Sequence, residues 1–200
     1  MQPISYYKNL HFGKNIFILA SGPSLEDLDL SSLKNKIVMG LNRSTLVYPT
    51  PYYQCVFDYR LFDLYLDAFK EVRQLFTLEG RPLGLTLKLL GGEGFSTDLE
   101  EGIYSGYTIS YFALQVAAYM GFKKIFFLGL DLKHDGPKTH FFGQDSQTVN
   151  HEQTEFPRMQ KMLAFGAQSL ANTDIEIYNC SPTSTLECFS KISYSEALTY

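Results

Sequence analysis

The sequence predicts an α/β protein, a single Rossmann-like domain with a mainly parallel sheet. Short continuous apolar runs alternate with longer mixed segments, the pattern of βα units. Several apolar runs end in a glycine or a small polar residue, as strands do where they meet a βα turn. The 200 residues match the size of one domain, so we expect residues 1–200 to form it, with residues 132–150 as a small lid.

Three strands are expected in the first third of the chain. Residues 15–20 (NIFILA), 36–41 (KIVMGL) and 52–57 (YYQCVF) are short, apolar and bounded by turn-forming residues. After the first strand, LEDLDLSSL has a weak helical pattern, and Ser24 is a suitable N-cap. Residues 59–78 carry the spacing of an amphipathic helix.

The middle of the chain is expected to form a buried helix followed by a central strand. Residues 82–90 (PLGLTLKLL) are compatible with a strand, and residues 91–102 with a mobile loop. Residues 107–120 are apolar nearly all round, which predicts a buried helix, and Gly121 is a natural residue to end it. Residues 124–128 (KIFFL) then form a strand.

The last third contains the expected lid, one helix and a final strand. Residues 132–150 are polar and rich in turn formers. Residues 151–171 have a helical pattern, with Pro157 in the first turn or at the true start. Residues 175–180 (IEIYNC) are the expected last strand.

Composition and charge argue against a nucleic-acid-binding protein, a membrane-spanning protein and a zinc protein. The formal net charge of −4 gives no basic face for nucleic acid, although a small phosphate pocket is compatible with it. No run approaches the roughly 18 apolar residues of a membrane span, and the first residues do not form a signal peptide. The three cysteines, Cys55, Cys180 and Cys188, match no zinc pattern and are expected as reduced thiols. These features predict a cytoplasmic protein and leave open binding at a membrane surface and self-association through Tyr- and Phe-rich surface.

Polar residues at the strand ends are the main candidates for ligand binding. They are Ser21, Gly22, Pro23 and Ser24 after the first strand, Asn42 after the second, Asp58 after the third and Asp131 after the KIFFL strand. Ligands of open α/β sheets bind beyond the carboxyl ends of the strands. Thr108 and Ser110 open the buried helix, where hydroxyls and free N–H groups suit an anion. Each residue could instead serve only as a cap or turn former, but together they predict one nucleotide site.

The histidines are the candidate general bases. His11 lies in the polar leader and is expected at the surface, His134 and His140 fall in the expected lid, and His151 stands at the start of a helix. A helix N-terminus favours the neutral imidazole that a base requires. The spacing of His134, His140 and His151 fits no strong metal-ligand pattern, so no metal or other cofactor is expected.

The absence of two known catalytic motifs argues against two classes of reaction. The chain contains no G-x-S-x-G elbow and no Walker lysine. Serine-hydrolase acyl transfer and P-loop phosphoryl transfer are therefore not expected.

Three segments carry a family resemblance that extends from about residue 14 to 195. They are ILASGPSLEDLDLSSL, YTISYFALQVAAYMGFKKIFFLGLDL and IEIYNCSPTSTLE. They resemble the bacterial CMP-sialic acid-dependent sialyltransferases of mucosal pathogens. They equally resemble a related superfamily that includes flagellin nonulosonate-transfer proteins and an archaeal hydroxymethylpterin pyrophosphokinase.

The resemblance implies a Rossmann-like, inverting, metal-independent glycosyltransferase that uses a CMP-activated sugar donor and a glycan acceptor, as in lipopolysaccharide biosynthesis. Ser21 stands where the family has an asparagine that contacts the nucleotide, Asn42 matches a family asparagine, and Asp58 falls near a third one. The stretch Thr108-Ile109-Ser110 partly matches the family's Thr-Ser-Gly.

The resemblance also implies which residues act as the general base and which assist the leaving phosphate. The family's general-base histidine maps onto His151. Its two lid tyrosines, which assist the leaving phosphate, fall near Lys133 and His140, and these could take their place.

Two alternatives remain open on the sequence. The first is a Mg²⁺-dependent pyrophosphokinase that holds its metal through Asp58 and Asp131. The second is a nucleotide- or glycan-binding protein without catalysis, which the missing lid tyrosines favour.

Overall fold

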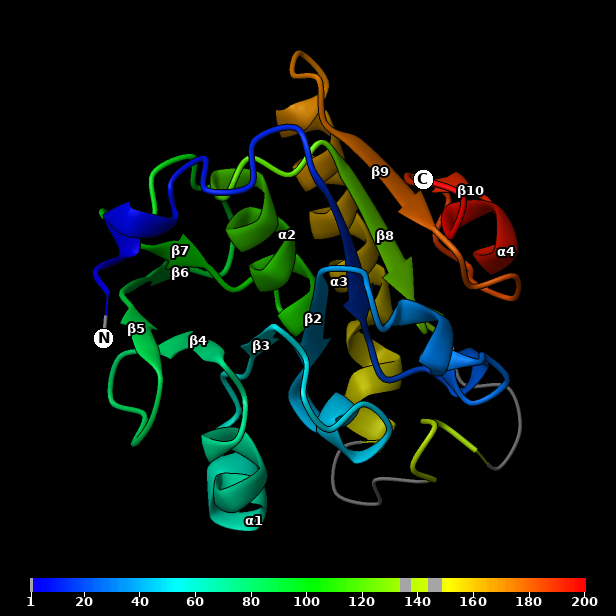
Figure 1. The fold of residues 1–200 in the computed structure, drawn as a ribbon, viewed down its shortest axis with the longest axis horizontal. Coiled ribbons are helices and arrows are strands. Elements are labelled where there is room, and N and C mark those ends of the chain that lie inside the picture. Colours follow the sequence, from blue (N-terminus) through cyan, green and yellow to red (C-terminus); the bar gives the residue numbers. More distant parts are fainter. Residues whose placement is uncertain (1, 134–137, 144–148) are drawn as a thin grey trace.

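A computed structural model describes residues 2–133, 138–143 and 149–200, with the backbone but not the side chains for 149–153. Its centre is an eight-stranded sheet in the order β10-β9-β8-β1-β2-β3-β4-β5, and all of its neighbouring strands pair in parallel (Figure 1). The strands are β1 Asn15–Leu19, β2 Val38–Leu41, β3 Tyr53–Cys55, β4 Gln74–Leu78, β5 Leu85–Leu87, β8 Lys124–Leu128, β9 Glu176–Asn179 and β10 Ser190–Lys191. This parallel sheet confirms the predicted Rossmann-like α/β class.

The chain order changes direction at β1, which lies between β2 and β8. Phe17 is in register with Val38 on one side and Phe126 on the other. In open parallel sheets such a switch point opens a crevice beyond the strand ends. The predicted site residues follow these central strands.

Helices cover both faces of the sheet (Figure 1). They are α1 Tyr59–Lys70, α2 Ile109–Tyr119, α3 Val149–Leu170 and α4 Tyr194–Ala197, with 3₁₀ turns η1 Ile4–Tyr7, η2 Pro23–Leu25, η3 Leu30–Leu33 and η4 Asn42–Leu46. Ile16 and Ile18 of β1 pack in the core cluster that contains α2, whereas Phe17 and Leu19 pack in the cluster beneath η2, η3 and α4. This alternation follows from the two-residue period of a strand.

Of the two helices predicted in the first half of the chain, the first does not form and the second is shorter than predicted. The stretch after β1 forms η2 and η3 instead of an α-helix, and its N-cap is Gly22, not Ser24. Asp29 caps the second turn by accepting from the Ser31 amide at 3.1 Å, which breaks the stretch in two. Helix α1 ends at Lys70, and the expected helical residues 74–78 are strand β4. A parallel strand buried on both faces lacks alternation and resembles helix in its pattern.

Residues 82–90 contain two strands that belong to different sheets. Strand β5 joins the edge of the main sheet, while β6 Leu89–Gly91 pairs with β7 Ile103–Tyr104 in a two-stranded sheet. The expected loop lies between β6 and β7.

The second half corrects two further expectations. Pro157 lies inside α3, eight residues after its first residue, Val149. Proline lacks the amide hydrogen that would bond the carbonyl four residues earlier, yet the helix continues through it. The strand β9 is not the last, because β10 adds two parallel residues at the sheet edge.

His11 is buried rather than at the surface, with 7% of its area exposed. Its ring stacks on Phe122 and its Nε2 lies 2.6 Å from the Tyr53 hydroxyl. The leader is thereby fixed to the sheet and to the turn after α2.

The three cysteines are free thiols, as predicted. Cys55 and Cys180 are buried, and Cys188 is half-buried.

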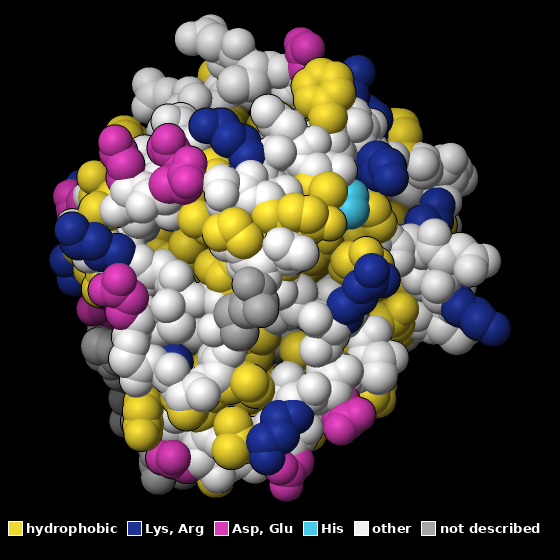
Figure 2. All heavy atoms as spheres, turned by 60° about the vertical axis from the view of Figure 1, so that its left-hand side comes forward, with side chains coloured by type: hydrophobic (Ala, Val, Ile, Leu, Met, Phe, Trp, Pro, Cys, Tyr) yellow, Lys and Arg dark blue, Asp and Glu magenta, His cyan; other side chains and the backbone are white. Residues whose placement is uncertain are grey.

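Apolar side chains also reach the surface. On the side turned forward in Figure 2 they lie between scattered charges of both signs. The exposed large apolar residues of the molecule include Tyr6, Phe12, Leu89 and Leu90. Across the described residues, no helix has the length and apolar character to cross a membrane.

Candidate functional site

A cavity of about 530 Å³ lies beyond the carboxyl ends of the central strands, beside the start of α2. Of the residues predicted for the site, those that line it are Ser21, Gly22, Asn42, Asp58, Thr108, Ser110, Asp131, Lys133 and His140. A volume of this size matches small-molecule and cofactor pockets. The strand-end residues therefore converge on one cavity.

The turn after β1 is held in place by Asp131. The Ser24 amide and hydroxyl donate to the two carboxylate oxygens of Asp131 at 2.9 and 2.5 Å. Gly22 is required here because a Cβ would lie 2.4 Å from Asp131 Oδ2 and 2.6 Å from the Gly129 carbonyl. Asp131 therefore positions the turn, and Ser21 and Gly22 are the members of the turn that border the cavity.

Asn42 is held in an uncommon conformation at the end of β2. Its φ is 49°, in the left-handed region that asparagine tolerates better than most residues. The buried Gln54 side chain on β3 donates to the Asn42 carbonyl at 2.9 Å. The Asn42 Oδ1 is buried and has no hydrogen-bond partner in the described part of the chain. Asn42 as a residue lines the cavity, so its side-chain amide is a candidate contact for a ligand.

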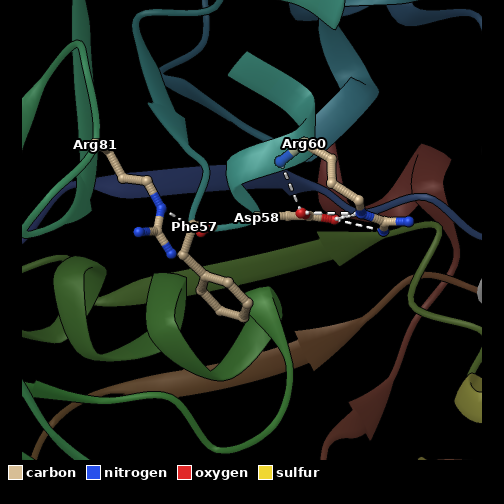
Figure 3. Close-up of polar contacts among 4 residues, drawn as sticks. All are labelled: Phe57, Asp58, Arg60 and Arg81. Carbon is tan, nitrogen blue, oxygen red and sulfur yellow. Dashed lines mark hydrogen bonds and ion pairs between the residues drawn. The ribbon is translucent and has the colours of Figure 1, made fainter. Parts of the chain in front are cut away.

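Asp58 is bound by Arg60 rather than open to a ligand cation. It caps α1 by accepting from the Arg60 amide at 3.1 Å, and Arg60 Nη2 donates to its Oδ2 at 2.7 Å (Figure 3). Burial raises the pKa of Asp58, but the hydrogen bonds from Arg60 and the charges of Arg60 and Arg43 outweigh it and hold the pKa below its usual value. Asp58 is therefore ionised and paired at neutral pH.

The N-terminus of α2 points at the cavity. Thr108 is the N-cap and accepts from the Ser110 amide at 3.3 Å. Gly106 and Tyr107, which precede it, both have positive φ values of 53° and 60°. This sharp turn ends β7 and aims the positive end of the helix dipole at the site, where an anion is stabilised.

Residues 138–143 cover one side of the cavity. The Phe141 amide donates to the Ser21 carbonyl at 3.1 Å, and the Phe141 side chain is buried. His140 stacks on Phe142 at 4.6 Å between ring centroids, and the Arg43 guanidinium lies 4.5 Å from the Phe142 ring. This stack places His140 at the cavity wall, where Thr139 also lies. The rest of the expected lid, 134–137 and 144–148 and with it His134, lies outside the described residues.

Helix α3 borders the cavity with its first half. Glu155, Phe156 and Met159 are among the lining residues. His151 belongs to the first turn of α3, and its side chain lies outside the described part. Its position is four residues before Glu155, so the two positions share one face of the helix.

Several lining residues were not predicted from the sequence, chiefly Arg60, Arg81, Tyr107, Glu155, Phe156 and Met159. Arg81 was missed because the strand that it follows, β4, had the pattern of a helix. Arg60 follows the third strand by a few residues, so a search extended into the first turn after each strand would have found it. Pro23 and Ser24 do not line the cavity.

The described residues contain no group of three His, Cys, Asp or Glu side chains that could hold a metal ion. Asp58 and Asp131, the pair considered for Mg²⁺, are bound by Arg60 and Ser24 respectively.

Among the comparisons with known proteins, only the comparison with solved structures finds matches. The sequence matches no family model and no curated protein. The sialyltransferase CstII from Campylobacter jejuni, in complex with cytidine-5'-monophosphate, matches with a TM-score of 0.56 and 16% identity, covering 91% of this chain and 86% of that chain. Its complex with the substrate analogue CMP-3FNeuAc matches with a TM-score of 0.53 and 14% identity over 90% of this chain and 86% of that one. This chain therefore has a sialyltransferase-like fold.

Proposed function

We propose that this protein is a glycosyltransferase that transfers a sialic-acid-like sugar from a CMP donor to a glycan hydroxyl, with inversion and without a metal. The observation that carries the proposal is the single cavity formed by Ser21, Asn42, Asp58 and Thr108 at four separate turns of the fold. The solved structures that share this fold include complexes with CMP and a CMP-sugar analogue. Their cytidine ligands suit a site made of turn amides, an asparagine and a helix N-terminus.

The reaction needs stabilisation of a leaving phosphate. The bond from the anomeric carbon to the CMP phosphate oxygen breaks, and CMP departs with the electron pair. We assign the binding of that phosphate to Lys133 and His140, which line the cavity, together with the amides at the start of α2. Hydrogen bonds and charges aimed at the developing negative charge lower the barrier.

The acceptor must lose a proton as the new bond forms. The glycan hydroxyl oxygen attacks the anomeric carbon from the side opposite CMP, which inverts the configuration. We assign His151 as the general base that takes the hydroxyl proton. Its helix-start position favours the neutral imidazole, and the position shares the face of α3 that carries Glu155.

Replacement of the base tests the mechanism. His151→Ala is expected to lower the transfer rate by about 10²–10⁴-fold, the usual contribution of a general base, while CMP affinity stays within about twofold. Added imidazole is expected to restore part of the rate. The measurements are donor-dependent transfer in EDTA and CMP titration, and transfer by His151→Ala at the wild-type rate would remove His151 from the mechanism.

A ligand screen separates the proposal from its alternatives. Thermal unfolding is followed with CMP, UMP, ADP and GDP, each with and without Mg²⁺. Stabilisation by CMP in EDTA supports the transferase, since a ligand that binds the native state raises the unfolding temperature. Stabilisation by ADP only with Mg²⁺ contradicts it, and CMP binding without any sugar transfer leaves a non-catalytic binding protein.

A further inference from the structure

The side chain of Gln54 is a fully buried amide at the centre of β3. Burial is unfavourable for an amide unless new hydrogen bonds replace those with water. Here Nε2 donates to the Asn42 carbonyl at 2.9 Å, and Oε1 accepts from the buried Ser44 hydroxyl at 3.4 Å. Both partners belong to η4, the turn that follows β2. The buried amide therefore connects β3 to the turn that begins at Asn42.

The neighbouring strand β2 leaves room for this amide. Gly40 of β2 is in register with Gln54. A Cβ at Gly40 would lie 2.1 Å from Gln54 Oε1 and 2.3 Å from Ser44 Oγ, so a side chain at this position would displace the amide. A glycine inside a strand weakens the strand, and a close approach of this kind is a physical reason for one. Gly40, Gln54 and Ser44 thus form one arrangement that supports the Asn42 carbonyl.

Asn42 is the member of this turn that lines the cavity. Its φ of 49° lies in the left-handed region, which is unfavourable for residues that carry a Cβ. Because the direction of Cβ follows the backbone, the position of the Asn42 side chain depends on this conformation being kept. The hydrogen bond from Gln54 fixes the carbonyl of the same residue. Gln54 is not among the residues that line the cavity, so it can affect a ligand only through its neighbours.

We propose that Gln54 is a positioning residue for the nucleotide: it holds Asn42 in the left-handed conformation in which the Asn42 side chain contacts CMP. This inference rests on the proposed function, and it adds a residue that sets affinity without touching the ligand. A turn without this support adopts the binding conformation only part of the time. The apparent affinity for CMP then falls by the fraction of molecules that have it.

A double-mutant cycle with Asn42 tests the assignment. Calorimetry measures CMP affinity in EDTA for the wild type, Gln54→Met, Asn42→Gly and the double variant. Gln54→Met removes the amide but keeps an unbranched side chain. It is expected to weaken CMP about three- to tenfold, at most the effect of the one hydrogen bond from Asn42. In the Asn42→Gly background no side chain remains to be positioned, so Gln54→Met is expected to change the affinity by less than about twofold.

Gln74→Met is the matched control. Gln74 of β4 also donates its amide to a backbone carbonyl, that of Leu75 at 2.8 Å. It is the first residue of its strand, at the opposite edge of the sheet from the cavity, and it does not line the cavity. Gln74→Met is expected to lower the free energy of unfolding in urea and to leave CMP affinity within about twofold of the wild type.

Ser44→Ala is a milder second variant, which decides the question if Gln54→Met does not fold. It removes only the hydroxyl that donates to Gln54 Oε1. It is expected to weaken CMP about two- to threefold, and to have no such effect in the Asn42→Gly background.

Three results would overturn the inference while the proposed function stands. They are an unchanged CMP affinity in both Gln54→Met and Ser44→Ala, an equal loss with and without the Asn42 side chain, and a loss in Gln74→Met as large as that in Gln54→Met. The last two would show a general disturbance of the sheet. If the wild type does not bind CMP, the proposed function fails and the inference fails with it.

Discussion

At the residue scale, single buried polar side chains hold the turns that carry the site residues. Gln54 is fully buried and supports the left-handed backbone of Asn42, and Asp131 holds the turn that carries Ser21. Asn42 and Ser21 were predictable, because each is the first polar residue after an apolar run of the sequence. The support from Gln54 was not, since it depends on which strand is the neighbour of β2.

His11 shows what a sequence pattern cannot indicate about burial. Its chain neighbours Leu10 and Phe12 are exposed, whereas its own ring packs against the aromatic side chains of Phe122 and Tyr53. Burial, followed by the charge of Lys14, lowers the pKa of His11 below its ordinary value. Protonation in the native state is therefore opposed.

This lowered pKa predicts how stability depends on pH. Above about pH 6.5 His11 is neutral in both the folded and the unfolded chain and contributes no pH dependence. Below that pH the unfolded chain binds a proton more readily, so the free energy of unfolding falls as the pH falls toward the folded-state pKa. Urea unfolding at pH 7.5 and 5.5 is expected to show a smaller loss for His11→Gln than for the wild type. An equal loss in both proteins would show that His11 is not responsible.

At the element scale, α2 and the corner that follows it connect the leader to the sheet. The helix is buried on nearly all sides, as its composition predicts. Gly121 ends it with a φ of 81°, and a Cβ there would lie 3.1 Å from the Cα atoms of Asn9 and Phe12. The helix end was predictable from the glycine, but the packing of the leader against it was not.

Gly121→Ala tests this corner. The left-handed conformation costs an alanine about 1–2 kcal/mol, and contact with the leader backbone is expected to add to that cost. Gly80→Ala is the matched control, because Gly80 has a φ of 79° but a Cβ at that position would have no neighbouring atom within 4 Å. Urea unfolding is expected to show a greater loss of stability for Gly121→Ala. Equal losses would mean that the leader moves aside without cost.

The two segments that the sequence misjudged have separate physical causes. Strand β4 pairs in parallel with β3 and β5, and four of its five residues are buried, so it lacks the alternation that distinguishes strands from helices. Helix α3 passes through Pro157, where local preference predicts a boundary, because tertiary packing outweighs the loss of one hydrogen bond. Both errors also affected the site, since Arg81 follows β4 and Glu155 precedes Pro157.

At the scale of the whole molecule, the parallel sheet brings distant residues to one place. Ser21, Asn42 and Thr108 come from separate parts of the chain, yet all line one cavity. The sheet class and the site edge were predictable from apolar runs and their polar ends. The side chains that complete the cavity were not, because α1, α3 and the β4–β5 connection reach it only through the tertiary fold.

The central claim is that these separate turns bind one cytidine phosphate without a metal. Calorimetric titration of CMP in EDTA tests it most directly, with Asn42→Gly and Ser110→Ala as variants on separate elements. Asn42→Gly removes the amide but tolerates the φ of 49°. The account predicts one-to-one binding that each variant weakens about tenfold, the effect of one lost hydrogen bond. No binding of CMP, or binding that neither variant changes, would contradict it.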